Sequence, residues 1–287
     1  MPEIRLENLS HVYSKGTPFE KVALDHVDLT IPAGQLIVLL GHTGSGKSTL
    51  VQHLNGLLKP TEGTVLLDGQ DIHRSKQALR ETRFQVGLVM QYPEYQLFEE
   101  TVRKDIAFGP SNMGLKAEEL EEHIRLGADF AGVDEELFDK SPLDLSGGQK
   151  RRVAIAGVLA MEPGVLILDE PTAGLDPAGC DDILRNVKRY QVETGSTVIL
   201  ISHDMNTAAE LAERIVVVRN GAIALDGTPD EVFAHAEELR DMGLDIPDST
   251  TVGLLLKKQG FPMPDGISTT DELVEAVMAL KGGKGVC

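Results

Sequence analysis

Four short, unbroken runs of apolar residues limit the class of fold that this chain can adopt. The runs cover residues 37–40, 165–168, 198–201 and 215–218. A strand that is apolar at every position is buried on both faces of a sheet, whereas a half-exposed strand alternates apolar and polar residues. Candidate helices lie at residues 47–58, 148–161, 181–193 and 205–214. Strands that alternate with helices predict an α/β core with a largely parallel sheet.

Other segments depart from this pattern. Residues 4–13 and 23–31 predict an antiparallel patch. The pair Asn220-Gly221 predicts a tight turn that joins two strands of a hairpin. From about residue 99 to 160 the sequence is rich in helix formers, and its first part, to Ser141, has 12 acidic and 5 basic residues. We expect a helical insertion there.

Two capping patterns predict helices in the last part of the chain. Thr228-Pro-Asp-Glu231 and Thr269-Thr-Asp-Glu272 each place a threonine three residues before a glutamate. A threonine cap and a glutamate at the third helical position satisfy each other's backbone N–H groups. We therefore expect one domain over residues 1–226 and a small, mostly helical region over 227–287.

The composition excludes several classes of protein. The 287 residues carry 45 acidic and 27 basic side chains, a net charge of -18. Such a surface is unsuited to neutralising the phosphates of nucleic acid, so we expect no nucleic-acid partner. Two cysteines, Cys180 and Cys287, are too few for a disulfide framework and favour a reducing cytoplasm. The longest apolar runs span about five residues, against about 18 for a membrane-spanning helix, and the N-terminus lacks a signal-peptide pattern.

Residues 41–48, Gly-His-Thr-Gly-Ser-Gly-Lys-Ser, match the pattern G-x-x-x-x-G-K-[ST] between a predicted strand and a predicted helix. Glycines let backbone N–H groups turn toward a phosphate, and the helix N-terminus adds a favourable partial charge. Lys47 can reach the β- and γ-phosphates, and the Ser48 hydroxyl can bind Mg²⁺. The alternative, a glycine-rich turn with an incidental lysine, fits this strand–loop–helix context poorly. The predicted nucleotide-binding residues are Gly41, His42, Thr43, Gly44, Ser45, Gly46, Lys47, Ser48 and Thr49.

Two carboxylates, Asp169 and Glu170, end the buried run Val165-Leu-Ile-Leu. Asp169 is predicted to bind Mg²⁺, directly or through water, and Glu170 to orient or deprotonate the attacking water. An acidic pair that only faces solvent is the alternative, and the phosphate loop upstream disfavours it. The two motifs together predict a P-loop NTPase.

A second phosphate-binding pattern follows at Leu145-Ser-Gly-Gly-Gln149, which opens a predicted helix. A hydroxyl and N–H groups at a positive helix end can bind phosphate, although an ordinary N-capped helix is the alternative. Two such ends in one chain are redundant unless the second binds a nucleotide held by another subunit. The sequence resembles the ATP-binding cassette (ABC) ATPases, in which this signature closes over the partner's ATP. The resemblance implies that Ser146, Gly147, Gly148 and Gln149 bind nucleotide.

The same resemblance implies roles for four further positions. Tyr13 stands where the family stacks an aromatic ring on adenine, and Gln91 where a glutamine senses Mg²⁺ and contacts the membrane partner. Gly174-Leu-Asp176 resembles the loop that crosses the dimer interface, and His203 the histidine that contacts the γ-phosphate. The alternatives are a packing role for the tyrosine, a solvent-facing glutamine and a structural histidine. The implied catalytic residues are Glu170, His203 and Gln91, and the implied metal ligands are Ser48, Gln91 and Asp169.

A narrower resemblance covers residues 91–98 and 101–110, Gln-Tyr-Pro-Glu-Tyr-Gln-Leu-Phe and Thr-Val-Arg-Lys-Asp-Ile-Ala-Phe-Gly-Pro. These runs are similar to the ATPases of energy-coupling factor (ECF) transporters, of the EcfA/CbiO type. That group uses two ATPases, equal or different, a transmembrane coupling protein (EcfT type) and a substrate-binding membrane S-component to import vitamins or transition-metal ions. The resemblance implies a peripheral ATP-hydrolysing subunit at the cytoplasmic face of the membrane, with a C-terminal dimerisation region.

Three alternatives to the ECF assignment remain. The cassette could serve conventional uptake or efflux, act on DNA or ribosomes, or be a non-hydrolysing regulatory subunit. Phe98, Ile106 and Phe108 could also be core residues and not part of a docking surface.

Overall fold

The computed structural model describes residues 1–282, which divide into two compact units. The first unit comprises Met1–Gln35 and Ser48–Ile201, and the second comprises Leu36–Lys47 and the chain from Ser202 onward. The predicted domain boundary near residue 227 stays a prediction. Cys180 forms no disulfide, and Cys287 lies outside the described residues.

The first unit contains two groups of strands. One is an antiparallel sheet with the order β2-β1-β4-β5, made of β1 (Ile4–Tyr13), β2 (Lys21–Ile31), β4 (Glu62–Leu67) and β5 (Gln70–Asp71). The other has the parallel order β6-β7-β8, made of β6 (Val86–Val89), β7 (Val165–Asp169) and β8 (Thr197–Ile201). Every residue of β7 and β8 is buried. The antiparallel patch and the fully buried strands are therefore confirmed.

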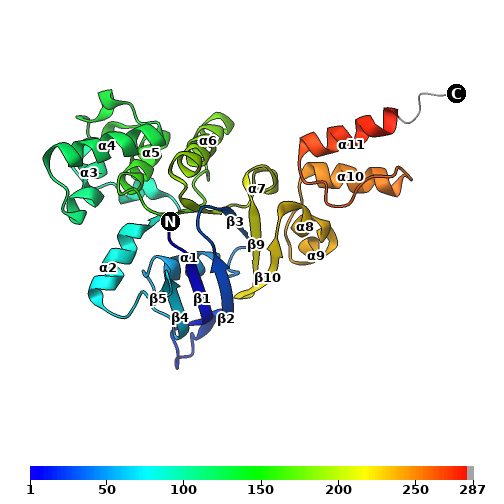
Figure 1. Cartoon of the computed structure of the whole chain (residues 1–287), viewed down its shortest axis with the longest axis horizontal. Coiled ribbons are helices and arrows are strands. Elements are labelled where there is room, and N and C mark those ends of the chain that lie inside the picture. Colours follow the sequence, from blue (N-terminus) through cyan, green and yellow to red (C-terminus); the bar gives the residue numbers. More distant parts are fainter. Residues whose placement is uncertain (283–287) are drawn as a thin grey trace. The chain divides into compact units, whose positions relative to one another are not determined.

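The helices of the first unit include a group that packs on itself. They are α1 (Lys47–Leu54), α2 (Lys76–Gln85), α3 (Val102–Met113), α4 (Ala117–Ala131), α5 (Gly147–Leu159) and α6 (Pro177–Thr194), with the short 3₁₀ turns η1 (Pro93–Gln96), η2 (Glu135–Leu137) and η3 (Pro142–Asp144). Helices α3, α4 and α5 pack on one another (Figure 1). Ile106, Ile124 and Phe138 are buried in this region. The helix-rich sequence near residues 99–160, where a helical insertion was expected, thus forms a group of helices that pack on one another.

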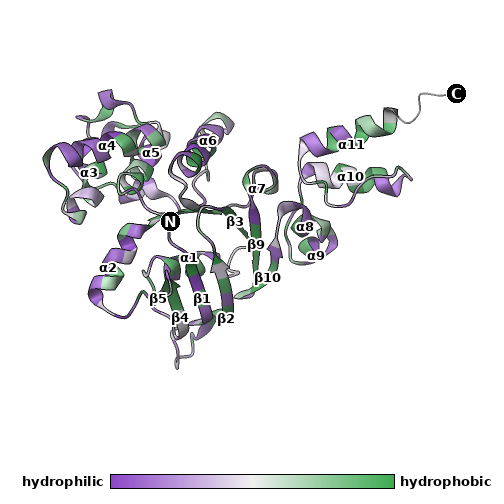
Figure 2. Ribbon diagram, in the orientation of Figure 1, coloured by the Kyte–Doolittle hydropathy of each residue, from purple (hydrophilic) through white to green (hydrophobic). Residues whose placement is uncertain are grey.

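The second unit contains the strand that precedes the phosphate loop. Strand β3 (Leu36–Leu40) pairs in parallel with β9 (Arg214–Arg219), and β10 (Ala222–Gly227) pairs antiparallel with β9. Asn220 and Gly221 have φ angles of 50° and 81°, so both adopt the left-handed conformation that a two-residue hairpin turn requires. The predicted hairpin is confirmed, and Figure 2 shows the apolar interior of β9 between its polar ends.

The remaining helices of this unit are short. They are α7 (Met205–Leu211), α8 (Pro229–Ala234), α9 (Ala236–Asp241), α10 (Asp248–Lys258) and α11 (Thr270–Gly282). Thr228 and Glu231 form the predicted reciprocal cap of α8. At α11, Thr269 N–H donates to Glu272 at 3.0 Å and Glu272 N–H donates to the Thr269 hydroxyl at 3.4 Å. The sequence-based prediction of a mostly helical C-terminal region is confirmed.

Three helix boundaries differ from the predictions by three or four residues. Helix α1 ends at Leu54 and not at residue 58, because Gly56 adopts φ 68° and the chain turns there. Helix α7 ends at Leu211, since Ala212 is extended. Helix α6 begins at Pro177, earlier than residue 181: Asp176 accepts from Gly179 N–H at 2.9 Å and Pro177 fits the first helical position. Within residues 1–282, no helix is both long and apolar enough to span a bilayer.

Candidate functional site

The phosphate loop of the second unit is held in shape by strand β9 and the hairpin turn. Gly41, Gly44 and Gly46 have φ angles of 152°, 82° and 114°. A Cβ on Gly41 would lie 2.4 Å from the Val218 carbonyl oxygen and 2.6 Å from the Ser45 hydroxyl oxygen, so only glycine fits. Gly221 N–H donates to the Ser45 carbonyl at 2.8 Å. The loop conformation is therefore determined by its neighbours in this unit.

The side chains of the loop are arranged as a phosphate site requires. Lys47 is 6% exposed, and its Nζ donates to the carbonyls of Gly41 at 2.6 Å and His42 at 3.2 Å. The ammonium group thus lies over the loop itself. The Ser45 hydroxyl is buried, and no described residue hydrogen-bonds to it. A buried polar atom without a partner costs free energy, so this hydroxyl is available to a ligand or a water molecule.

In the first unit, Tyr13 and Thr49 lie together. The Tyr13 hydroxyl is 3.2 Å from the Thr49 hydroxyl, and the partly exposed Tyr13 ring meets the edge of His11 at a centroid distance of 4.5 Å. Thr49 and Ser48 both belong to the first turn of α1. The structure therefore places the predicted adenine-stacking ring beside the helix that begins at the phosphate loop.

A pair of buried histidines, to which sequence reasoning assigned no role, supports this arrangement. His53 Nδ1 lies 2.7 Å from the Thr49 carbonyl oxygen, and His53 Nε2 lies 3.1 Å from His11 Nδ1. A carbonyl only accepts, so Nδ1 of His53 carries the proton and its Nε2 accepts from His11. Burial lowers the pKa of His53 to about 4, which keeps the ring neutral. Only the fold brings these residues together, 42 positions apart in the sequence.

The two carboxylates occupy the end of β7. Asp169 is buried and pairs with Ile201, while Glu170 turns into the left-handed region at φ 50° and donates its N–H to the Ile201 carbonyl at 3.1 Å. A non-glycine residue in this conformation is strained, and such strain is concentrated at functional sites. The Gln91 side-chain nitrogen donates to Glu170 Oε2 at 2.9 Å, which joins residues 79 positions apart.

The signature residues form the N-terminus of α5. Ser146 caps the helix: its hydroxyl accepts from Gln149 N–H at 3.3 Å, and Gln149 Oε1 accepts from Ser146 N–H at 3.0 Å. A Cβ on Gly147 would meet nothing within 4 Å, and one on Gly148 would meet only Leu175 at 3.9 Å. Neither glycine has a positive φ. Nothing within residues 1–282 therefore requires glycine at these two positions.

Two further predicted positions lie in exposed segments. Gly174 has φ 76° in the loop that leads to the Asp176 cap of α6. His203 is exposed, in the segment between β8 and α7. The roles of all these site residues stay predictions.

Sequence reasoning also missed a buried arginine. Arg151, two residues after the signature, forms a two-pronged ion pair with Glu94 of η1. Burial alone would raise the pKa of Glu94, but the hydrogen bonds from Arg151, a backbone hydrogen bond and the positive charge of Arg151 together lower that pKa. The signal was present in the sequence as Lys150-Arg-Arg, because a polar residue on the inner face of a helix needs a buried partner.

Comparison with known proteins agrees with this geometry. The family model described as "ABC transporter" matches residues 24–173. The energy-coupling factor transporter ATP-binding protein EcfA2 of Caldanaerobacter subterraneus subsp. tengcongensis is 51% identical over 99% of both chains. The protein of the same name from Clostridium perfringens is 50% identical over 96% of this chain and 98% of its own.

Solved structures give the same result. The cbiO1 protein of Clostridium perfringens, described as part of the ABC transporter complex cbiONQ, superposes with a TM-score of 0.72 and 42% identity, covering 83% of this chain and 93% of that one. A dimeric ATP-binding cassette in a post-hydrolysis state, bound to ADP and Pi, superposes with a TM-score of 0.71 and 30% identity, covering 78% and 98%.

Fold, site and similarity together define an ABC-type ATPase, an enzyme that binds and hydrolyses ATP. The chain belongs to the ATP-binding subunits of energy-coupling factor transporters within that family. The predicted fold class and the ECF assignment are confirmed, in preference to a conventional uptake or efflux cassette.

Proposed function

We propose that this chain is one of two ATPase subunits that close over ATP at the cytoplasmic face of a membrane. Closure and hydrolysis would drive import of a vitamin or another micronutrient through a transmembrane coupling protein of the EcfT type and an S-component. The relatives carry the names of ECF transporter subunits, and a solved neighbour is part of a cbiONQ complex. The second ATPase could be an identical or a related chain.

The observation that carries the two-subunit clamp is the open space at Gly147 and Gly148. Glycine is less favourable than alanine in a helix by up to about 1 kcal/mol. At these positions neither the backbone conformation nor packing against the described residues offsets that cost. Among the described residues nothing requires glycine here, and a phosphate that approaches the positive end of α5 closely would supply that requirement.

Within one subunit, each predicted residue has a defined task. The loop N–H groups and Lys47 would bind the β- and γ-phosphates, and Tyr13 would stack on the base. Glu170 would accept a proton from the attacking water, while His203 would contact the γ-phosphate. The signature of the partner subunit would complete the site, so hydrolysis would require closure.

The oxygen donors of the first unit fit Mg²⁺, which prefers hydroxyl, carboxylate and amide oxygens. Ser48, Asp169 and Gln91 would hold the ion. The amide nitrogen of Gln91 faces Glu170 in the structure, which leaves its amide oxygen for a cation. When bound, Mg²⁺ would neutralise charge on the phosphates.

The coupling protein would dock in a cavity of about 290 Å³ in the first unit, between η1, α3 and α5. Phe98 and Phe108 line it, and their rings meet edge to face at 4.9 Å. They are 64% and 48% exposed, whereas Ile106 is 0% exposed. Ile106 is thus a core residue, and the two phenylalanines are available to a partner.

Exposed apolar residues of α10 and α11, such as Leu255 and Met278, would contribute to dimerisation.

The test of the clamp is Gly148→Ala in the complete transporter complex. The melting temperature of the complex should stay unchanged or rise, because alanine favours the helix and finds open space. ATP turnover should fall by roughly tenfold or more, since the added methyl group blocks close approach of phosphate. In a Glu170→Gln background, which should lower turnover by roughly 100-fold or more while ATP binding persists, Gly148→Ala should also weaken ATP-dependent subunit association. Normal turnover in either single variant would contradict the assigned role.

A further inference from the structure

Arg151 is a buried arginine of α5 that contacts two other segments of the first unit. Its side chain is 4% exposed. Nε donates to Glu94 Oε2 at 3.0 Å, and Nη2 donates to Glu94 Oε1 at 2.7 Å. Nη1 donates to the carbonyl oxygens of Pro171, at 3.2 Å, and Ala173. One guanidinium thus joins η1, α5 and the segment that follows β7.

These contacts lie close to Gln91 and Glu170, the hydrogen-bonded pair that the proposed mechanism uses. Glu94 lies three residues after Gln91, and Pro171 directly follows Glu170. Ala173 N–H also donates to the Glu170 carbonyl at 3.2 Å. Arg151 therefore contacts residues that are close in sequence to Gln91 and to Glu170, which are hydrogen-bonded to each other. Arg151 itself belongs to α5, the helix that Ser146 caps.

The cavity proposed for the coupling protein lies between the same elements. Its lining includes Gln96 of η1 together with Val153 and Ala154 of α5. A partner that displaces η1 there would move Glu94, and the ion pair would carry this movement to α5 and to the segment behind Glu170.

Stability alone is a poor explanation for this ion pair. Removing two charges from water costs several kcal/mol per ion, and apolar residues of similar volume are often equally stabilising. A planar guanidinium instead provides a fixed fork, so it sets the mutual orientation of its partners in a way that lysine does not. The hydrogen bonds to the carbonyls of Pro171 and Ala173 also orient the backbone next to Glu170, the proposed base.

We propose that Arg151 is a positioning residue for ATP hydrolysis. It fixes the Gln91–Glu170 pair relative to the signature helix and links both to the cavity where the coupling protein docks. This inference rests on the proposed function, because it takes Glu170 as the base.

The test compares Arg151→Lys with the double variant Glu94→Gln/Arg151→Gln, each in the complete transporter complex. Arg151→Lys keeps the charge and loses the fork. Its KM for ATP should stay within about twofold of the original, and kcat should fall about 10- to 100-fold, as expected for a displaced catalytic group. The double variant buries no unpaired charge, so its melting temperature should return toward the original while kcat stays low.

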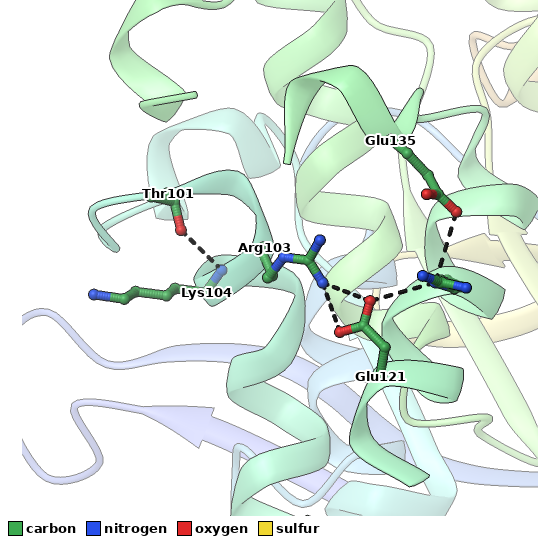
Figure 3. Close-up of polar contacts among 6 residues, drawn as sticks. Thr101, Arg103, Lys104, Glu121 and Glu135 are labelled. Atoms are coloured by element: carbon green, nitrogen blue, oxygen red, sulfur yellow. Dashed lines mark hydrogen bonds and ion pairs between the residues drawn. The ribbon is translucent and has the colours of Figure 1, made fainter. Parts of the chain in front are cut away.

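A matched control is provided by Arg103 of α3, which pairs with Glu121 of α4 (Figure 3). Its Nη1 lies 2.5 Å from both carboxylate oxygens, but the side chain is 37% exposed and contacts neither η1 nor the segment after Glu170. Arg103→Met should leave kcat unchanged.

Two results would overturn the proposal. One is a normal kcat in Arg151→Lys, and the other is a kcat that recovers together with stability in the double variant, which would show a merely structural role. Glu170→Gln is measured alongside. If it hydrolyses ATP normally, the proposed function fails; if it is inactive while Arg151→Lys is normal, only the positioning role fails.

Discussion

At the scale of single residues, the buried histidine pair makes stability depend on pH. The folded-state pKa of His53 is about 4, because burial disfavours its charged form, and a histidine in an unfolded chain titrates near 6.5. Between these values the unfolded state binds more protons than the folded state. The contribution of His53 therefore lowers the free energy of unfolding as the pH falls from about 6.5 to 4, by up to about 3 kcal/mol.

Measuring the free energy of unfolding from pH 7.5 to 4.5 tests this expectation. His53→Gln should show a smaller loss across the window than the original chain, because glutamine does not titrate. His26→Gln, at an exposed histidine, makes the same substitution outside the buried pair and is the control. Identical slopes in all three chains would contradict the prediction.

Residue types that carry chemistry could be predicted from the sequence, but their mutual contacts could not. The phosphate loop, the two carboxylates and the signature each lie within a few consecutive positions, so local spacing reveals them. Arg151 and Glu94 lie 57 positions apart, and their contact exists only because α5 packs against η1. The same holds for His11 and His53, whose sequence neighbours contain no signal of a buried pair.

At the scale of elements, the apolar residues at the cavity between η1, α3 and α5 are of two kinds: some are exposed and some are buried in the core. Phe98→Ala should leave the melting temperature of the complex nearly unchanged, because the ring is largely exposed. It should reduce the amount of coupling protein recovered with the ATPase from solubilised membranes. Ile106→Ala should instead lower the free energy of unfolding by about 2–5 kcal/mol, as is usual for a cavity in a packed core.

Quantitative recovery of both subunits by affinity purification measures the first effect, and thermal unfolding measures the second. Normal recovery with Phe98→Ala would show that this cavity is not the docking surface.

Strand positions were predictable because complete burial requires unbroken apolar runs. Helix ends were less so: Gly56 ends α1, and the Asp176-Pro177 cap starts α6 before its apolar pattern begins.

At the scale of the whole molecule, the charge distribution agrees with a subunit that works among protein partners. The helical insertion and the C-terminal region carry most of the net charge of -18, while the phosphate loop and the signature helix present donors. Membranes carry negative charge on their cytoplasmic surface, so an acidic chain gains little from direct contact with lipid. Attachment through membrane proteins is the physically favoured arrangement.

We expect purification from solubilised membranes to recover this chain with a second ATPase and a coupling protein. High salt should weaken the assembly only modestly, because apolar residues such as Phe98 and Phe108 form the proposed contact and salt screens only exposed charges. Mass spectrometry of the purified complex identifies the subunits. Recovery of the chain without membrane proteins would contradict the assignment. The transported solute would be set by the membrane partner and not by this chain.

The tight fit of Gly41 against β9 has a consequence for the thermodynamics of ATP binding. Because the Val218 carbonyl and the Gly221 N–H hold the loop in place, its backbone loses conformational entropy when the protein folds. That entropy is not lost again when nucleotide arrives, so affinity benefits from the preorganised loop. The β9–β10 hairpin, which is far from the phosphate loop in the sequence, therefore contributes to that affinity.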